Sequence, residues 1–416
     1  MTILKDILRE SRFVLGNRVT RLTWLILSVI CAAALVLGQA EINRQTDTIE
    51  RTRAQDRIEL AQALDGAADY GGAAYDAFSL TWNPPDDVAF LAIGQRDIAP
   101  WMLRIRALAL EGQIHESDNF NPELSLAGRF DYAFVIAFVL PLFIIALLYD
   151  VYAGERDSGR VAMLTATARR AGRLWAPRIL ALSGGAALAC LLPLWLLGLS
   201  FGGNAAALLA VSAIVIAAVI FWSLLVSVVA FRTWSASVSA ALATSCWLIL
   251  ALLVPLSGKL LIDRAVPGID GARISLLQRE TVNGAWDLPK AATMDRFYAS
   301  HPEWSHSAPV AAPFHWKWYY AFQQVGDETA APLSAAHRES IIARDRLTAY
   351  TAIFSPPVAV MRSLQKIAGT DTQSALAYEQ KIRDYHAEIR HFFYPLLFEE
   401  VAFSRENLSG FPLFED

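Results

Sequence analysis

Two groups of side chains contain residue types that can ligate metal ions: His301, His306 and His315 in one stretch, and His386, Glu388 and His391 in another. Neither group has the spacing of a known zinc site, and two histidines five residues apart on a helix point away from a shared face. The chain also lacks the Gly-x-x-x-x-Gly-Lys-Ser/Thr sequence that holds nucleotide phosphates. We therefore expect a non-catalytic chain without a metal site.

A more promising set of side chains lies in the charged stretch 152–175, between two apolar runs. It consists of charges and a turn residue: Glu155, Arg156, Asp157, Gly159 and Arg160. Such charge pairs can fix the register of a bound protein, and glycine permits a turn. Beyond the turn, three residues would form a small apolar ridge: Val161, Leu164 and Ala168. The alternative is that these arginines only set the membrane topology.

Aromatic residues concentrate in a third stretch, Pro313–Phe322, which contains Trp316, Trp318, Tyr319 and Tyr320. Neighbouring aromatic rings most often pack into a core. A belt at the level of lipid headgroups is the second interpretation, and the lining of a substrate path is the third.

Composition indicates which elements must position these residues. The chain of 416 residues is 55% hydrophobic and 18% charged with a net charge of −4, which is typical of a membrane protein and offers no basic surface for nucleic acid. Five runs have the roughly 20 apolar residues that a spanning helix requires. These runs are Leu22–Ala40, Tyr132–Tyr149, Ile179–Phe201, Ala205–Phe231 and Thr233–Leu256. The cysteines Cys31, Cys190 and Cys246 lie inside them, and we expect all three to be packing residues.

Lysines and arginines concentrate in the first 21 residues and between the second and third runs. Because cytoplasmic loops are enriched in these residues, the N-terminus and residues 150–178 are predicted to be cytoplasmic. Residues 1–21 predict an amphipathic elbow helix in the cytoplasmic interface. The alternative for this region is a signal peptide that is cleaved after Ala40.

Two long segments remain on the outer face. In residues 41–131, the first span is predicted to continue as a helix to about Gly66, followed by turns and extended pieces in which Val88, Phe90 and Ala92 alternate. Residues 257–416 predict helices near Ala335–Thr348 and Thr372–Phe393. The expected fold is a mainly α, polytopic membrane protein with two extracytoplasmic inserts, the first mixed α/β and the second mostly helical.

The stretch Asn121–Arg170 has an Asn-Pro pair before a span and the sequence Glu-Arg-Asp-Ser-Gly, from Glu155, after it. It resembles the membrane subunits of ABC-2-type transporters, where a Glu-x-Glu-x-Gly signature follows the span. "LAIGQRDIAP" (Leu91–Pro100) and "SPPVAVMRSLQKIAGTD" (Ser355–Asp371) resemble a bacterial subfamily with two large periplasmic inserts of unassigned function. The similarity covers most of the chain. It departs at Asp157, which replaces the second glutamate, and at Arg160, where threonine is usual.

The resemblance implies the permease of an ATP-binding-cassette exporter in a bacterial inner membrane, with periplasmic inserts. It implies an ATPase partner in two copies, which would bind ATP and Mg²⁺, and a second permease copy or a paralogue. This chain would hold no cofactor, and residues 152–175 would be the coupling loop that contacts the ATPase. The alternative is a scaffold or sensor whose spans only anchor it in the lipid bilayer while the inserts bind a periplasmic partner.

ABC-2 permeases have six spans, whereas this sequence predicts five. The late apolar run His391–Phe403 is interrupted by Pro395, Glu399 and Glu400, and it is too short to cross about 30 Å of hydrocarbon. We therefore expect all of 257–416 to lie outside the membrane and a sixth span to follow Asp416 in the natural chain.

Overall fold

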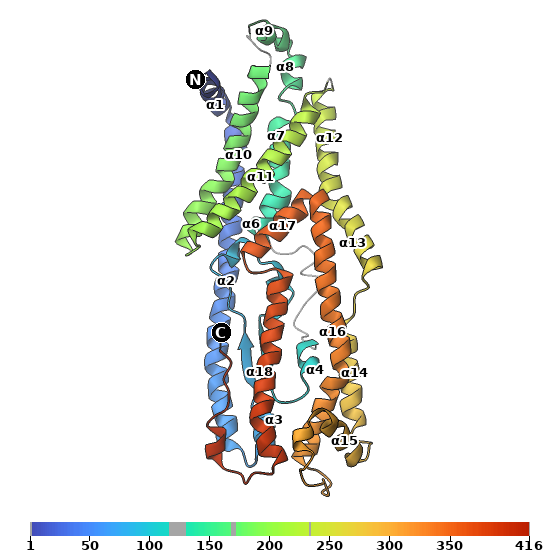
Figure 1. The fold of residues 1–416 in the computed structure, drawn as a ribbon. Helices are drawn as coiled ribbons and strands as arrows, with labels where there is room; N and C mark the ends of the chain where they lie inside the picture. The colour runs from blue at the N-terminus through green and yellow to red at the C-terminus, as the bar shows by residue number, and fades with distance from the viewer. Residues whose placement is uncertain (1, 116–129, 168–171, 233, 416) are drawn as a thin grey trace.

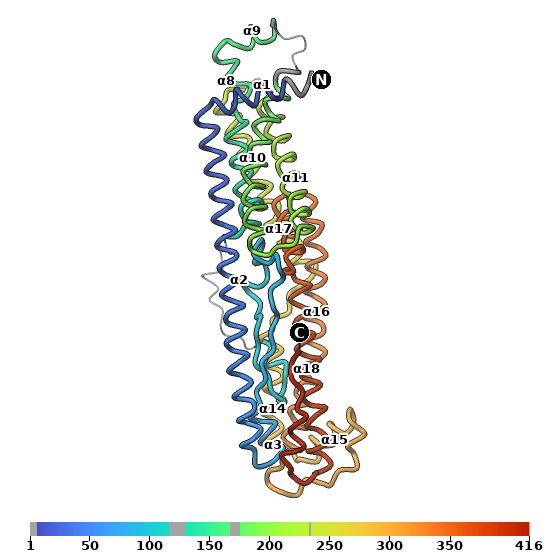
Figure 2. The backbone as a smooth tube through the Cα atoms, turned by 90° about the vertical axis from the view of Figure 1, so that its left-hand side faces the viewer, coloured from blue at the N-terminus to red at the C-terminus, as the bar shows by residue number. Residues whose placement is uncertain are grey.

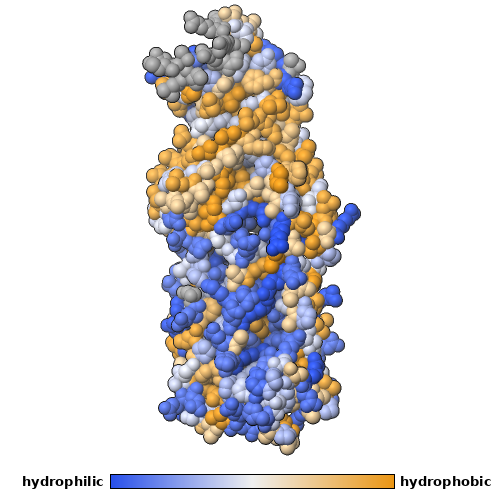
Figure 3. Space-filling model, in the orientation of Figure 1, coloured by the Kyte–Doolittle hydropathy of each residue, from blue (hydrophilic) through white to orange (hydrophobic). Residues whose placement is uncertain are grey.

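The computed structural model describes residues 2–115, 130–167, 172–232 and 234–415. The molecule is an elongated, mainly helical rod (Figure 1). One half of the visible surface carries an apolar band and the other half is largely hydrophilic (Figure 3). The N-terminus lies at the end of the apolar half, and the C-terminus lies within the hydrophilic half.

Helix α1 (Thr2–Gly16) meets α2 (Arg18–Gly66) at Asn17, whose side chain accepts a hydrogen bond from Val19 N at 2.9 Å and so caps α2. Helix α1 crosses the end of the bundle, while α2 runs along nearly the whole molecule (Figure 2). At 1.5 Å per residue the 49 residues of α2 extend about 73 Å, more than twice the hydrocarbon thickness. The predicted continuation of the first span to Gly66 is confirmed.

Within the described residues, five helices are long and apolar enough to cross a membrane. We call them the membrane bundle. They are Arg18–Gly66, Tyr132–Asp157, Trp175–Ser200, Ala205–Ala230 and Ala236–Ala265. The second combines α6 (Tyr132–Phe134), η3 (Val135–Val139), α7 (Leu140–Leu148) and α8 (Ala153–Asp157). The third and fourth are α10 (Gly172–Ser200) and α11 (Ala205–Ala230), and the fifth combines α12 (Ala236–Leu248), η4 (Ile249–Leu253) and α13 (Val254–Ala265).

The hydrophilic half, which we call the distal body, contains the outer part of α2 and most of both predicted inserts. From the first insert come α3 (Tyr70–Asp76), α4 (Leu110–His115) and the antiparallel strands β1 (Ser79–Trp82) and β2 (Met102–Ile105), in which Ser79 pairs with Ile105. From the second come α14 (Gly271–Gly284), α15 (Lys290–Ser300), η5 (Pro302–Trp304), α16 (Trp316–Phe354), α18 (Thr372–Phe398) and η6 (Arg405–Leu408). Their apolar residues share one core.

Two pieces of the inserts belong to the core of the bundle instead. The segment around η1 (Ala89–Leu91) and η2 (Gly94–Asp97) is buried there, as is one face of α17 (Pro356–Ile367). The prediction of an extended segment with Val88, Phe90 and Ala92 alternating is wrong, because residues 88–93 are all buried and turn through a short 3₁₀ helix. Gly38 permits this packing, since a Cβ there would lie 2.1 Å from Phe90 O.

Candidate functional site

Residues 150–167 of the predicted coupling loop form two short helices at the apolar end of the molecule, α8 and α9 (Arg160–Thr167). Gly159 joins them with a φ of 72°, in the left-handed region that favours glycine. Helix α9 lies beyond the ends of the bundle helices, near α1 (Figures 1 and 2). We call this the loop end of the molecule.

Glu155 of this loop is held by arginines of the same chain. It accepts hydrogen bonds from Arg160 Nε at 2.6 Å and from Arg178 Nη1 at 2.8 Å. Arg178 Nε also donates to Glu10 of α1 at 3.1 Å, and the Phe13 ring lies 5.0 Å from the guanidinium carbon. The side chains of Glu10, Glu155 and Arg178 are 9%, 13% and 16% exposed. One arginine of α10 thus joins the elbow helix to the loop.

Arg156 ties the loop to the turn between α11 and α12. Its Nη2 donates to Asp157 Oδ1 at 2.9 Å and to Trp234 O at 2.8 Å. The charges predicted to contact a partner are therefore paired within the chain, although Asp157 and Arg160 remain 53% and 57% exposed. On α9, Met163 is 62% exposed, Val161 and Leu164 are half-buried, and Ala168 lies outside the described residues, as does the Asn-Pro pair. The docking role itself stays a prediction.

The aromatic cluster lies in the distal body. Trp318 and Tyr320 are buried, and Tyr320 Oη donates to Gly71 O at 2.9 Å, while Trp316 is half-buried. A Cβ at Gly71 would lie 1.9 Å from the Trp316 ring, so the two inserts approach closely here. This burial favours the packing interpretation over the lining of a substrate path.

The predicted ligand-type histidines have separate structural roles. His386 is buried, and its Nε2 lies 2.8 Å from Leu108 O; burial and nearby Arg390 lower its pKa well below 6.5. His301 stacks on Phe297 with ring centroids 4.6 Å apart, and His315 caps α16 by accepting from Lys317 N. Among the described residues, no three His, Cys, Asp or Glu side chains are grouped to hold a metal ion.

Sequence reasoning missed the stretch Gly198–Gly202, which has the Gly-x-Ser-x-Gly spacing of a hydrolase nucleophile turn. That motif requires a strand followed by a helix. Here it follows a helix instead, at the end of α10, and Ser200 Oγ donates to Leu197 O at 2.8 Å. The local structure therefore does not support a nucleophile.

The two sequence pieces singled out by their resemblance meet between the bundle and the distal body. Gln95 N donates to Thr370 O at 2.8 Å, and Thr370 Oγ1 donates to Ala92 O at 2.8 Å. Gly94 and Gly369 adopt φ values of 54° and 62°, and a Cβ at Gly94 would lie 2.5 Å from Thr370 O. Nothing in the hydropathy pattern indicates this pairing, because it depends on two glycine turns.

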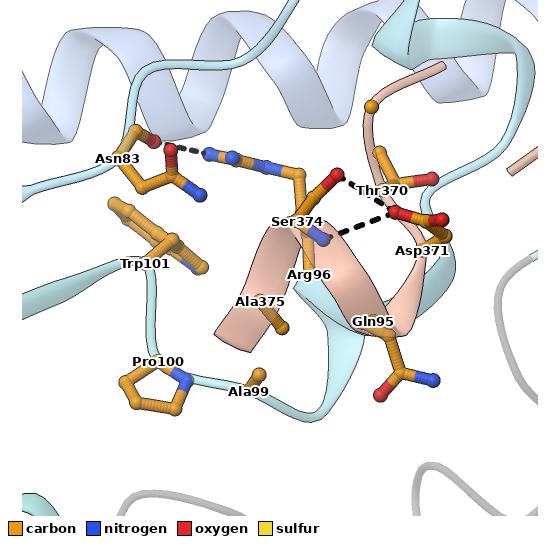
Figure 4. Close-up of a pocket in the computed structure, with 11 residues that line it drawn as sticks. Asn83, Gln95, Arg96, Ala99, Pro100, Trp101, Thr370, Asp371, Ser374 and Ala375 are labelled. Carbon is orange, nitrogen blue, oxygen red and sulfur yellow. Dashed lines mark hydrogen bonds between the residues drawn. The ribbon is translucent and has the colours of Figure 1, made fainter. Parts of the chain in front are cut away.

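Arg96 fills the space beside this junction (Figure 4). It donates to Gln45 Oε1 at 2.8 Å and to Asn83 O at 2.9 Å. Burial lowers its pKa to about 10, so it remains charged at neutral pH. The remaining cavity is about 10 Å³, room for about one water molecule. This part of the junction is therefore packed.

Two larger pockets lie on either side of α17. The apolar pocket, about 550 Å³, is lined by Ile93, Gly94, Asp97, Asp131, Phe134, Phe138, Val139, Leu142, Trp247, Leu252, Met361 and Gln365. The cationic pocket, about 650 Å³, is lined by Gln95, Ile341, Arg344, Asp345, Thr348, Arg362, Ser363, Gln365, Lys366, Asp371, Thr372 and Gln373. Both volumes lie in the range of small-molecule sites.

Residues 273–415 match a family model described as a domain of unknown function, DUF3526. The match begins in α14 and includes α16, α17 and α18, so it covers the second insert and neither the bundle nor the loop end. No curated protein and no solved structure matches the chain.

Proposed function

We propose that the chain is the permease subunit of a bacterial ATP-binding-cassette transporter of the ABC-2 type, working as an exporter in the inner membrane. A separate ATPase, in two copies, would bind ATP and Mg²⁺ and dock on the loop end. The distal body would lie in the periplasm. This proposal rests on the resemblance of the sequence and on the geometry of the loop end.

The observation that carries the proposal is the anchoring of α8, which Gly159 joins to α9. A helix that transmits force must be attached firmly to the helices it moves. Arg178 joins α8 to α1 and α10, and Arg156 joins α8 to the α11–α12 turn. Beyond these contacts α9 extends with an exposed apolar side chain, Met163. An exposed apolar side chain beside a firmly held helix supports docking of a protein partner.

The fifth candidate span supports a second permease copy. Only 17% of its most apolar window is buried within the chain, against 33–50% for the other four, and α13 has no buried residue. Lipid could cover this surface, but a partner bundle would cover it as well. We therefore place the second copy or paralogue against α12 and α13.

The test is co-expression of the chain with any Walker-motif ATPase whose gene lies next to its own, followed by affinity purification. We expect the ATPase to co-purify with the wild-type chain, and Met163→Asp to reduce its recovery at least tenfold. Leu276→Asp is the control, because Leu276 is equally exposed, at 65%, but lies on α14 in the distal body.

If the wild-type chain recovers no ATPase, or if Met163→Asp and Leu276→Asp recover it equally, the docking site is wrong. The first outcome would favour the alternative, a scaffold or sensor whose distal body binds a periplasmic partner.

A further inference from the structure

The apolar pocket opens on an exposed side of the membrane bundle. Its wall includes Phe138, Val139 and Met361, and its rim residues Leu142 and Leu252 are 38% and 53% exposed. These rim residues lie on helices that are apolar enough to cross a membrane. A hydrocarbon chain can therefore enter the pocket from the side.

Two π-helical turns, η3 in the second span and η4 in the fifth, shape this pocket. Phe138 and Val139 of η3 and Leu252 of η4 belong to its lining. Each turn ends two residues before a proline, Pro141 or Pro255. Proline cannot donate a hydrogen bond and crowds the preceding turn, which accounts for the widened helix. Such turns are frequent at functional sites.

Trp247 adds an unused hydrogen-bond donor to this wall. Its indole ring lines the apolar pocket, and its buried Nε1 has no hydrogen-bond partner among the described residues. A buried N–H without an acceptor is unfavourable by about 1–3 kcal/mol. An oxygen atom of a bound ligand would satisfy it.

The cationic pocket lies across α17. Arg362 is paired with Asp345, Arg344 is paired with Asp263, and Asp371 caps α18 through Ser374. Lys366 is exposed, and its ammonium group has no ion pair among the described residues. The lining holds three cations, Arg344, Arg362 and Lys366, and two carboxylates, Asp345 and Asp371, so its net charge is +1.

The two pockets adjoin each other. Gln365 lines both, and the neighbouring residues Gly94 and Gln95 line one each. Helix α17 lies at the border between the apolar band and the hydrophilic half, and the visible surface is hollowed near this level (Figures 1 and 3). The apolar pocket could hold the hydrocarbon chain of a molecule whose negatively charged headgroup lies in the cationic pocket.

We propose that α17 holds an anionic amphiphile, a phospholipid-like molecule whose chain occupies the apolar pocket and whose phosphate or carboxylate contacts Lys366. The site draws the molecule from the membrane leaflet at this end of the bundle. The proposal depends on the bundle lying in a membrane, but it does not depend on an ATPase partner.

The test is native mass spectrometry of the full chain in detergent, titrated with dioleoyl phosphatidylglycerol or with phosphatidylcholine of the same chains. We expect one phosphatidylglycerol to bind at least fivefold more tightly than phosphatidylcholine. Lys366→Glu removes this preference and Lys366→Arg retains it. Arg346→Gln is the control, because Arg346 is an exposed cation on α16 that does not line the pocket.

A second variant tests the chain pocket. Leu142→Trp fills the rim and should weaken both lipids at least fivefold, whereas Leu256→Trp, at a position that is 54% exposed and outside the pocket, should bind as the wild type does. Equal binding of the two lipids by the wild type, or an unchanged preference in Lys366→Glu, overturns the headgroup assignment. If glycerol phosphate, which has no hydrocarbon chain, competes with bound phosphatidylglycerol as strongly as the lipid itself does, the assignment of the apolar pocket to a hydrocarbon chain is overturned.

Discussion

Arg178 joins three elements at the loop end, because it lies on α10 and contacts carboxylates of two other elements, Glu10 and Glu155. Substituting it leaves two largely buried carboxylates without this partner, and breaking a buried charge pair is strongly destabilising. No sequence pattern indicates this role, since Arg178 is only one of several basic residues before the third span.

We predict that Arg178→Gln loosens α1 by about 2 kcal/mol, so that its backbone amides exchange hydrogen at least tenfold faster. Arg160→Gln is the matched control, because Arg160 contacts only Glu155 among these groups and is 57% exposed. Equal exchange of α1 in the two variants would contradict the assigned role.

His386 gives the distal body a pH dependence. Its pKa is lowered well below 6.5 by burial and by Arg390, so the unfolded chain takes up a proton at a pH where the folded chain does not. The contribution of His386 to stability is therefore present above about pH 6.5 and is lost as the pH falls, by up to about 1.4 kcal/mol per pH unit.

We predict that the free energy of unfolding of the wild type decreases between about pH 6.5 and 5 and that His386→Gln makes this slope shallower. Denaturant unfolding at several pH values measures it. His306→Gln, at an exposed position, should keep the wild-type slope. A slope unchanged by His386→Gln means that another group titrates in this range.

At the scale of elements, the long helices are predictable and the short connections are not. Apolar runs and uninterrupted helix formers predict α2 and α18 closely, while α16 begins about twenty residues before the predicted Ala335. The extended prediction for 88–92 is wrong because alternation of apolar residues cannot distinguish a strand from a fully buried turn. Burial on all sides comes from α2 and the α10–α11 hairpin, which lie far away in sequence.

Gly38 is where that buried turn approaches α2. We predict that Gly38→Ala lowers the free energy of unfolding by about 1–3 kcal/mol, because its Cβ would overlap Phe90 O. Gly184→Ala on α10 has open space around its Cβ and should be neutral or slightly stabilising. Thermal unfolding of both variants in the same detergent compares them, and equal midpoints would contradict the close contact.

Ser355 fixes the start of α17. Its side chain accepts from Val358 N and donates to Leu250 O at 2.7 Å, within the π-helical turn η4. We predict that Ser355→Ala destabilises α17 by about 1–2 kcal/mol, seen as faster hydrogen exchange of its amides. Ser363→Ala, on the exposed face of the same helix, should leave the exchange unchanged.

At the scale of the whole molecule, the sequence predicted two inserts, and the structure places most of both in one distal body with a shared core. Hydropathy could not indicate this, since it describes each segment separately. The elbow helix, α9 and the α11–α12 turn lie at one end, while the C-terminus lies in the opposite half (Figure 1). The side of the membrane on which each end lies, as expected from the basic loops, stays a prediction.

We predict that these two ends lie on opposite sides of the membrane. Single cysteines at exposed positions, Ser158→Cys near α9 and Ser409→Cys in the distal body, should differ in labelling by a membrane-impermeant maleimide on intact cells with a permeable outer membrane. Ser409→Cys should react at once, and Ser158→Cys only after the inner membrane is opened. Labelling of both before opening contradicts the topology.

The uninterrupted course of α2 has a mechanical consequence. The helix contains no proline. Gly38, where it contacts Phe90, lies between its N-terminal end beside α1 and an outer part, Glu41–Gly66, that is about 39 Å long. A rigid tilt of α2 about Gly38 would therefore move both of its ends. A tilt of about 5° would displace the far end by about 3 Å, so small movements at the loop end become larger ones at the tip of the distal body.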